Sequence, residues 1–121
     1  MRKSVALLIV ALCVAAWAAP AFAKTETVTG EVISLSCYFQ NKKSVGQAGM
    51  ICAIATVKWE GNPAGLLTAD GRVYQLTGGL VARNNAKVVP LLGHTVTVTG
   101  DVYEKNGMMM IAADDAKVIG K

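Results

Sequence analysis

The chain has 121 residues, a formal net charge of +4 and a hydrophobic content of 53%. This length corresponds to one domain with a single hydrophobic core. When the two charges of Arg2 and Lys3 are removed from +4, the remaining charge is +2. A charge this small does not indicate nucleic acid or an anionic membrane as a partner.

Residues 1–23 have the pattern of a cleavable secretory signal. A basic start precedes an apolar run over residues 4–19, and small residues stand at Ala21 and Ala23. The run is shorter than the roughly 20 residues that a membrane-spanning helix needs. We therefore expect cleavage after Ala23, a single mature domain of residues 24–121 without stable membrane insertion, and a periplasmic or secreted location.

The mature segment contains two cysteines, Cys37 and Cys52, because Cys13 lies within the signal. Exported proteins meet oxidising conditions, so an even number of cysteines indicates a disulfide. Closing a loop of about 15 residues in this way stabilises a fold by roughly 3 kcal/mol in the chain-entropy model. The alternative is a pair of free thiolates that bind a metal or carry out redox chemistry.

The first predicted element is a long strand over residues 25–37. Its apolar side chains change face at Val32 and Ile33, and Gly30 allows the backbone to bend. We therefore expect a bent strand that contributes to two faces of a barrel. A polar loop follows over residues 40–49.

Residues 50–59 are predicted to form a short helix, because apolar residues recur there at helical spacing. Residues 64–77 follow as a hairpin whose strands meet at a two-residue turn, Asp70-Gly71. The connector at residues 80–92 ends in a short helix, which Gly93 terminates.

The cleanest strand covers residues 94–103, with valines on one face and threonines on the other. Asn106-Gly107 predicts a tight hairpin that returns through residues 108–112. The three methionines 108–110 cannot converge on one ion, because adjacent strand residues point to opposite faces. We expect either the middle one or the outer two to fill the core. Residues 117–119 form a last extended piece.

Two segments, residues 27–32 and 97–102, repeat almost the same hexapeptide. Each strand alternates and carries a glycine where a small barrel must coil tightly. The order of elements is strand, insertion, hairpin, helical connector and hairpin. This order predicts a mainly β, five-stranded OB-like barrel with a short helix between strands 3 and 4. The insertion after strand 1 carries the disulfide.

Five short motifs are spread over most of the mature segment. They are Cys37-Tyr38, Cys52-Ala53, Gly-x-Pro-x-Gly-Leu-Leu at 61–67, Gly-x-Val-Tyr at 71–74 and Thr-Val-Thr-Val-Thr-Gly at 95–100. In these motifs the chain resembles a family of small exported bacterial domains with OB-like barrels and no assigned function. Members often add a His three residues before the second Cys and a Cys four residues after it. This chain has Gly49 and Thr56 at these two positions, so two of the four ligands of such a metal cluster are missing. Their absence favours a disulfide between Cys37 and Cys52.

Tyr38, Phe39, Trp59 and His94 are the candidate ligand-binding residues. Three are aromatic residues in or beside the insertion, and His94 follows Gly93 at the barrel mouth. Loops on a rigid scaffold commonly carry function, although core packing or a water-exposed rim also explains such residues. No nucleophile elbow, phosphate-binding loop or zinc-helix motif occurs, so we assign no catalytic residue and no cofactor.

These observations favour a binding or protective module without catalytic activity. Its partner is an unknown small ligand or an envelope protein, not nucleic acid. The alternative is a copper protein that uses Cys37 and Cys52 with Met50 or His94. A thiol redox protein built on the two cysteines is the weaker alternative.

Overall fold

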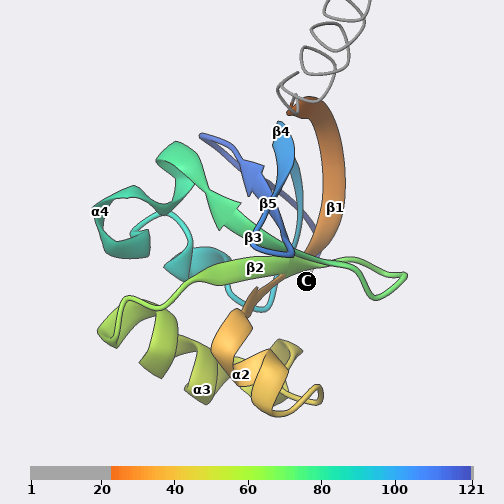
Figure 1. Ribbon diagram of the computed structural model, residues 1–121. Helices are drawn as coiled ribbons and strands as arrows, with labels where there is room; N and C mark the ends of the chain where they lie inside the picture. Colours follow the sequence, from red (N-terminus) through yellow and green to blue (C-terminus); the bar gives the residue numbers. More distant parts are fainter. Residues whose placement is uncertain (1–22, 121) are drawn as a thin grey trace, which may run out of the picture.

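A computed structural model describes residues 23–120, so nearly all of the predicted export signal lies outside the described residues (Figure 1). The strands are β1 (Lys24–Ser34), β2 (Ala64–Leu67), β3 (Val73–Thr77), β4 (Thr95–Lys105), β5 (Met108–Ala112) and β6 (Lys117–Gly120). The first five form a closed barrel in the order β1-β2-β3-β5-β4, in which β4 pairs back with β1. Only β3 and β5 pair in parallel among these neighbours. The predicted OB-like barrel is therefore confirmed.

Short helices lie in two places, after β1 and between β3 and β4. Those after β1 are α2 (Leu35–Gln40), a 3₁₀ turn (Gly46–Gly49), α3 (Met50–Ala53) and a π-helical segment (Ile54–Trp59). Those of the connector are a 3₁₀ turn (Gly78–Val81), α4 (Ala82–Asn85) and a 3₁₀ turn (Val89–Leu91). We call residues 35–59 the helical insertion; it forms a layer at one end of the barrel (Figure 1). Both predicted helical regions are confirmed.

The barrel interior is filled by aliphatic side chains that alternate along the strands. The most deeply buried include Val32, Leu66, Val96, Val98 and Ile111, together with Val57 of the insertion and Leu80, Val88 and Leu92 of the connector. Burying one such side chain contributes roughly 1.5–3 kcal/mol. The shared core therefore fixes the insertion and the connector against the barrel.

The methionines of β5 do not fill the core, contrary to the prediction. Met109 is 37% exposed, and Met108 and Met110 are half-buried. Ile111 takes the core position, because it lies deeper along the strand than Met109, which is close to the hairpin tip.

The two similar hexapeptides lie side by side as antiparallel partners in β1 and β4. Thr27 is opposite Thr99 and Thr29 is opposite Thr97. Their hydroxyls are 2.8 Å and 3.2 Å apart on the outer face, while the valines between them are buried. The repetition therefore reflects two strands that close the barrel against each other.

β1 is bent as predicted, but it ends earlier than residue 37. It pairs with β4 up to Glu31 and with β2 from Glu31 to Ser34. At Ser34 the chain turns into α2, and the Ser34 hydroxyl accepts a hydrogen bond from the Cys37 amide (3.3 Å). This N-cap ends the strand, so the assignment of residues 35–37 to it was wrong.

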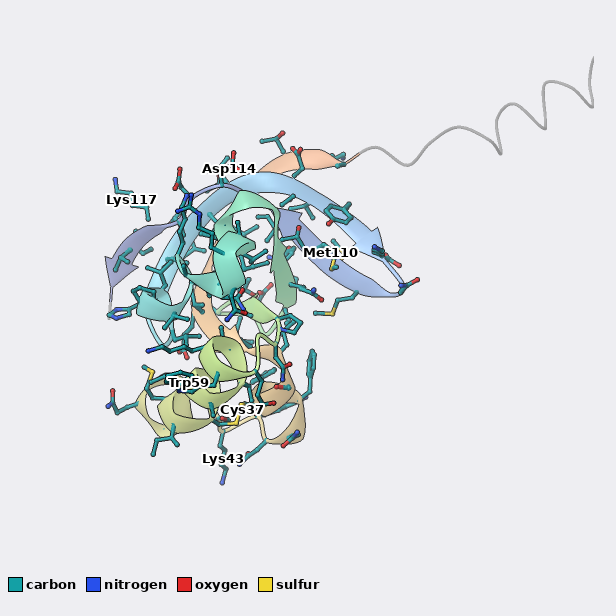
Figure 2. The ribbon with its side chains drawn as sticks, turned by 90° about the vertical axis from the view of Figure 1, so that its left-hand side faces the viewer. Cys37, Lys43, Trp59, Met110, Asp114 and Lys117 are labelled. Carbon is teal, nitrogen blue, oxygen red and sulfur yellow. A yellow bond between two sulfur atoms is a disulfide. The ribbon has the colours of Figure 1, made fainter. Side chains whose placement is uncertain are left out.

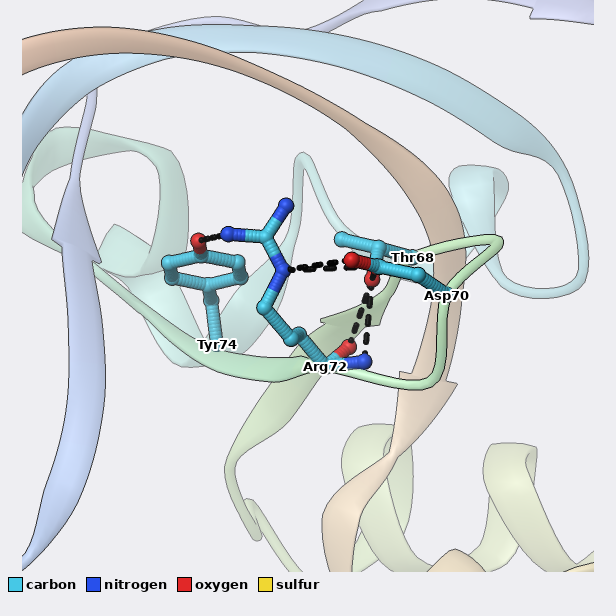
Figure 3. A network of polar contacts seen from close by, with 4 residues as sticks. All are labelled: Thr68, Asp70, Arg72 and Tyr74. Atoms are coloured by element: carbon cyan, nitrogen blue, oxygen red, sulfur yellow. Dashed lines mark hydrogen bonds and ion pairs between the residues drawn. The ribbon is translucent and has the colours of Figure 1, made fainter.

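The first hairpin turns more widely than predicted. Leu67 pairs with Val73, and of Asp70 and Gly71 only Gly71 has a positive φ (+88°), whereas both primed two-residue turns need a positive φ at the first position. The five residues of this loop are closed by a polar network (Figure 3). The Arg72 amide donates to the Thr68 hydroxyl (3.0 Å), and the Arg72 side chain binds Asp70 (3.0 Å).

The second hairpin has the predicted tight turn. Lys105 pairs with Met108, and the residues between them, Asn106 and Gly107, have φ values of +53° and +79°. Two consecutive positive φ values define the primed turn that an Asn-Gly pair favours.

The predicted disulfide joins Cys37 of α2 to Cys52 of α3, with 2.03 Å between the sulfur atoms. Cys37 is buried and Cys52 is exposed. The bond therefore ties the first helix of the insertion, α2, to α3. Among residues 23–120, no helix is long and apolar enough to cross a membrane.

Candidate functional site

The four predicted ligand-binding residues do not come together. Tyr38 and Phe39 lie in α2 with ring centroids 6.0 Å apart. Trp59 lies at the end of the π-helical segment, and His94 lies just before β4. Trp59 and His94 line two cavities that share no residue, and neither α2 ring lines them. The predicted residues that line a cavity therefore mark two separate places.

The cavity at His94 has a volume of about 370 Å³ and includes Glu31 and Met50. One oxygen of Glu31 accepts a hydrogen bond from the Gly46 amide (2.6 Å). Part of the hydrogen-bonding capacity of this carboxylate is therefore used within the protein. Within the described residues, no three His, Cys, Asp or Glu side chains gather as a metal site. The cysteines do not line this cavity and their sulfurs are joined to each other, whereas Met50 and His94 do line it. The predicted copper ligands are therefore divided between two places.

The two positions where the resembled family carries further metal ligands are filled differently here. A side chain at Gly49 would lie only 2.6 Å from the Ser44 carbonyl oxygen, which leaves no space for a ligand. The Thr56 hydroxyl lies 3.4 Å from the Cys37 sulfur and 2.6 Å from the Ser34 hydroxyl. These residues form a small hydroxyl cluster beside the disulfide and do not fit a metal cluster.

A groove of about 470 Å³ lies between the end of the helical insertion and the connector. Lys58 and Trp59 line its insertion side, and Arg83, Asn84, Ala86, Val89 and Pro90 line its connector side. We call this space the Trp59 groove. Its walls combine two cations, an aromatic ring and small apolar surfaces, which is the usual composition of a small-ligand site.

The helix that leads to Trp59 holds its ring in solvent. Ala53 and Val57 are buried against the core, whereas the Trp59 side chain is 74% exposed. The last six residues wind as a π-helix, an uncommon conformation that occurs often at functional sites. The Lys58 ammonium lies 4.8 Å from the centre of the Trp59 ring, so the ring and the positive charge act together.

The connector contains three consecutive residues with left-handed backbone, and the first two of them line the groove. Arg83 (φ 57°, ψ 48°), Asn84 (φ 55°, ψ 49°) and Asn85 (φ 64°) all have positive φ. Each such residue costs roughly 1–2 kcal/mol, although Asn tolerates the conformation better than Arg. The strain therefore falls mainly on Arg83.

The two asparagines gain hydrogen bonds from this conformation. Asn84 donates to the Lys58 carbonyl (3.2 Å), and Asn85 donates to the Val57 and Asn62 carbonyls (3.2 Å each). The bonds to Val57 and Lys58 satisfy carbonyls in the last turn of the helix, where intrahelical partners are missing. The left-handed turn thus joins the connector to the helix that carries Trp59.

Arg83 has no comparable compensation. In the described part of the chain, its guanidinium forms no hydrogen bond, and the two ion pairs found are Arg72–Asp70 and Lys87–Asp115. No acidic residue lines the Trp59 groove. Lys58 and Arg83 therefore leave two positive charges available to an anion beside an exposed ring.

Sequence reasoning found Trp59 but missed Lys58 and Arg83. The available signal was Arg83-Asn84-Asn85, a polar interruption between apolar runs that contains two residues tolerant of positive φ. Comparison of the chain with models of protein families, with curated proteins and with solved structures found no match.

Proposed function

We propose that this protein is an exported binding module without catalytic activity, and that the Trp59 groove holds a small ligand with an acidic group and an apolar or planar body. The observation that carries the proposal is the conformation of Arg83. Strained residues cluster at binding sites because the surrounding structure holds them for a purpose other than stability. Arg83 stands in such a conformation at the groove wall without a partner in the described chain.

The chemistry of the walls supports this class of ligand. An Arg guanidinium binds a carboxylate or phosphate through two parallel hydrogen bonds, and Lys58 adds a second charge. The face of Trp59 provides an apolar platform for a ring or chain. The disulfide and the barrel support export and a rigid frame, since disulfides persist in oxidising compartments.

Phenyl phosphate is a suitable first probe, because it joins a phosphate to a flat ring. At about 0.3 kcal/mol per non-hydrogen atom, a probe of about 11 such atoms binds in the millimolar range. Trp59 is the single tryptophan of residues 24–121, so its fluorescence reports on the groove directly. We expect a saturable change with phenyl phosphate and a much weaker response to phenol, which lacks the anion.

Arg83→Ala is the test variant. Arg72→Ala is the matched control, because Arg72 lies in the loop between β2 and β3 and does not line the groove. The first is expected to weaken phenyl phosphate binding at least tenfold, since hydrogen bonds to charged groups contribute about 1.5–3 kcal/mol. Arg72→Ala is expected to leave it unchanged. Equal effects of both variants, or no saturable response at all, would contradict the proposal.

A further inference from the structure

We infer that the acidic group held in the Trp59 groove is the phosphate of lipid headgroups, and that the helical insertion docks the protein on an anionic membrane surface. This inference rests on the proposed function. It names the partner of the same groove from the charges and exposed side chains of the insertion around it.

The helical insertion carries basic side chains and no acidic ones. Residues 35–59 contain Lys42, Lys43 and Lys58 and no acidic residue, while all eight Asp and Glu residues lie elsewhere. Two acidic residues border the insertion: Glu60 follows it in the sequence and accepts a hydrogen bond from the Asn62 side chain (3.4 Å), and Glu31 of β1 accepts one from the Gly46 amide (2.6 Å). The Lys43 side chain points away from the barrel at the far end of the layer (Figure 2).

The insertion also exposes large apolar side chains. Phe39 is 58% exposed, Ile51 87% and Trp59 74%, and these are three of the six large hydrophobic residues exposed in the described chain. Ile51 and Trp59 lie on the solvent side of one continuous helix. An α-helix turns about 100° per residue, and a π-helix turns through a smaller angle per residue because each of its turns contains more residues. Over the eight residues from Ile51 to Trp59, this smaller rotation brings Trp59 back toward the face of Ile51.

This combination matches the polar boundary of a bilayer. Interfacial helices place Trp, Phe and Leu-like side chains at headgroup depth, with lysines that reach the phosphates. Here each exposed aromatic residue has a lysine nearby in the sequence, and the Lys58 ammonium lies over the Trp59 ring.

The net charge of the whole chain did not indicate this partner. The acidic residues of the barrel, such as Asp101, Asp114 and Asp115, offset the lysines of the insertion in the total. Figure 2 shows Asp114 and Lys117 on the barrel, at the end opposite to Lys43. The charge that meets a surface is that of the insertion, because salt screens charges farther than about 8 Å away.

The test uses the exported protein, whose N-terminus is first determined by intact mass. Sedimentation with vesicles of phosphatidylglycerol and phosphatidylcholine is compared with sedimentation with phosphatidylcholine alone. We expect binding to the anionic vesicles only, with a shift of Trp59 emission to shorter wavelength. Binding to both vesicle types alike, or an unchanged Trp59 emission on the anionic vesicles, would overturn the inference.

Two pairs of variants separate the insertion from the barrel. Lys42→Glu with Lys43→Glu is expected to weaken vesicle binding by at least about 25-fold, since each lysine near an anionic surface contributes about fivefold. Lys105→Glu with Lys117→Glu makes the same charge change on the barrel and is expected to have less than a fivefold effect. Likewise, Ile51→Ser is expected to weaken binding and Ile119→Ser to leave it intact. Equal losses within either pair would overturn the inference.

The same samples are titrated with phenyl phosphate. If phenyl phosphate binds and the vesicles do not, the membrane inference fails and the proposed function stands; a protein partner would then remain for the exposed surface. If neither binds, both proposals fail.

Discussion

At the residue scale, the binding role proposed for Arg83 implies a cost in stability. Glycine adopts left-handed backbone without strain, so Arg83→Gly is expected to raise the free energy of unfolding by about 1 kcal/mol. It also removes the guanidinium and is expected to abolish phenyl phosphate binding. Arg83→Ala keeps the strain and should lose binding without gaining stability. Urea unfolding of the two variants measures the difference, and equal stability of both would contradict the role given to strain.

Asp70 gives a pH dependence with a defined sign. Its hydrogen bond from Thr68, and then its contact with Arg72, lower the pKa of the Asp70 carboxyl below its usual value (Figure 3). A lowered pKa in the folded state stabilises the fold at a pH above the unfolded value of about 3.9, and this contribution is lost as the pH falls through the folded-state pKa.

Asp70→Asn should therefore lower the urea midpoint at pH 7 and have a shrinking effect as the pH falls below about 3.9. Because the site is open to solvent, the difference at pH 7 is expected to be small. Urea midpoints of both proteins across this pH range provide the measurement. A difference that stays constant with pH would show that the ionised carboxylate contributes nothing.

Some single residues could be predicted from the sequence and others could not. The disulfide followed from two cysteines in a segment predicted to be exported, and the Asn106-Gly107 turn followed from the φ values that those residue types prefer. Arg83 could not be found in this way, because its left-handed backbone depends on bonds between Asn85 and the distant Val57 carbonyl. The sequence shows only that Asn84 and Asn85 tolerate a positive φ, not that these contacts form.

At the scale of elements, the disulfide holds the helical insertion in place. The loop between Cys37 and Cys52 spans 15 residues, so its removal is expected to reduce the free energy of unfolding by about 3 kcal/mol. Replacing both cysteines by alanine should have this effect and should also remove any response to a reducing agent. Urea unfolding with and without reductant tests it. If the native protein were equally stable with and without reductant, the disulfide would not contribute to stability, contrary to the prediction.

The glycine of the second hexapeptide allows two strands to approach closely. A methyl group at Gly100 would overlap the Ala112 carbonyl oxygen, although the backbone there needs no positive φ. Gly100→Ala is therefore expected to destabilise the barrel by about 3 kcal/mol, as overpacking does. Gly107→Asn is the control, because that site is open and Asn tolerates its φ of +79°. Similar unfolding midpoints for Gly100→Ala and the native protein would contradict this prediction.

Element boundaries were harder to predict than the elements themselves. Alternation in residues 94–103 and the helical spacing in residues 50–59 identified β4 and the insertion helix. The end of β1 was misplaced because Leu35 and Cys37 continue the alternating pattern, while the Ser34 cap redirects the backbone. The first turn was misjudged because Thr68 and Arg72 extend the loop by bonds that a dipeptide signal does not include.

At the scale of the whole molecule, the order of elements was enough to predict the barrel, since few topologies accommodate it. The Trp59 groove was not predictable, because its walls are residues 58–59 and 83–90, which only the closed fold brings together. The positive charge of the insertion was hidden in the total charge because acidic residues of the barrel offset its lysines. Export and signal cleavage remain predictions that intact mass of the exported protein can test.

The most direct test of the proposed site is a map of backbone amide chemical shifts across the exported protein during titration with phenyl phosphate. We predict that the saturable changes concentrate in residues 57–60 and 82–90, on the two walls of the Trp59 groove. Changes that concentrate around His94, or on the outer face of β3 and β5, would show that the groove is not the binding site.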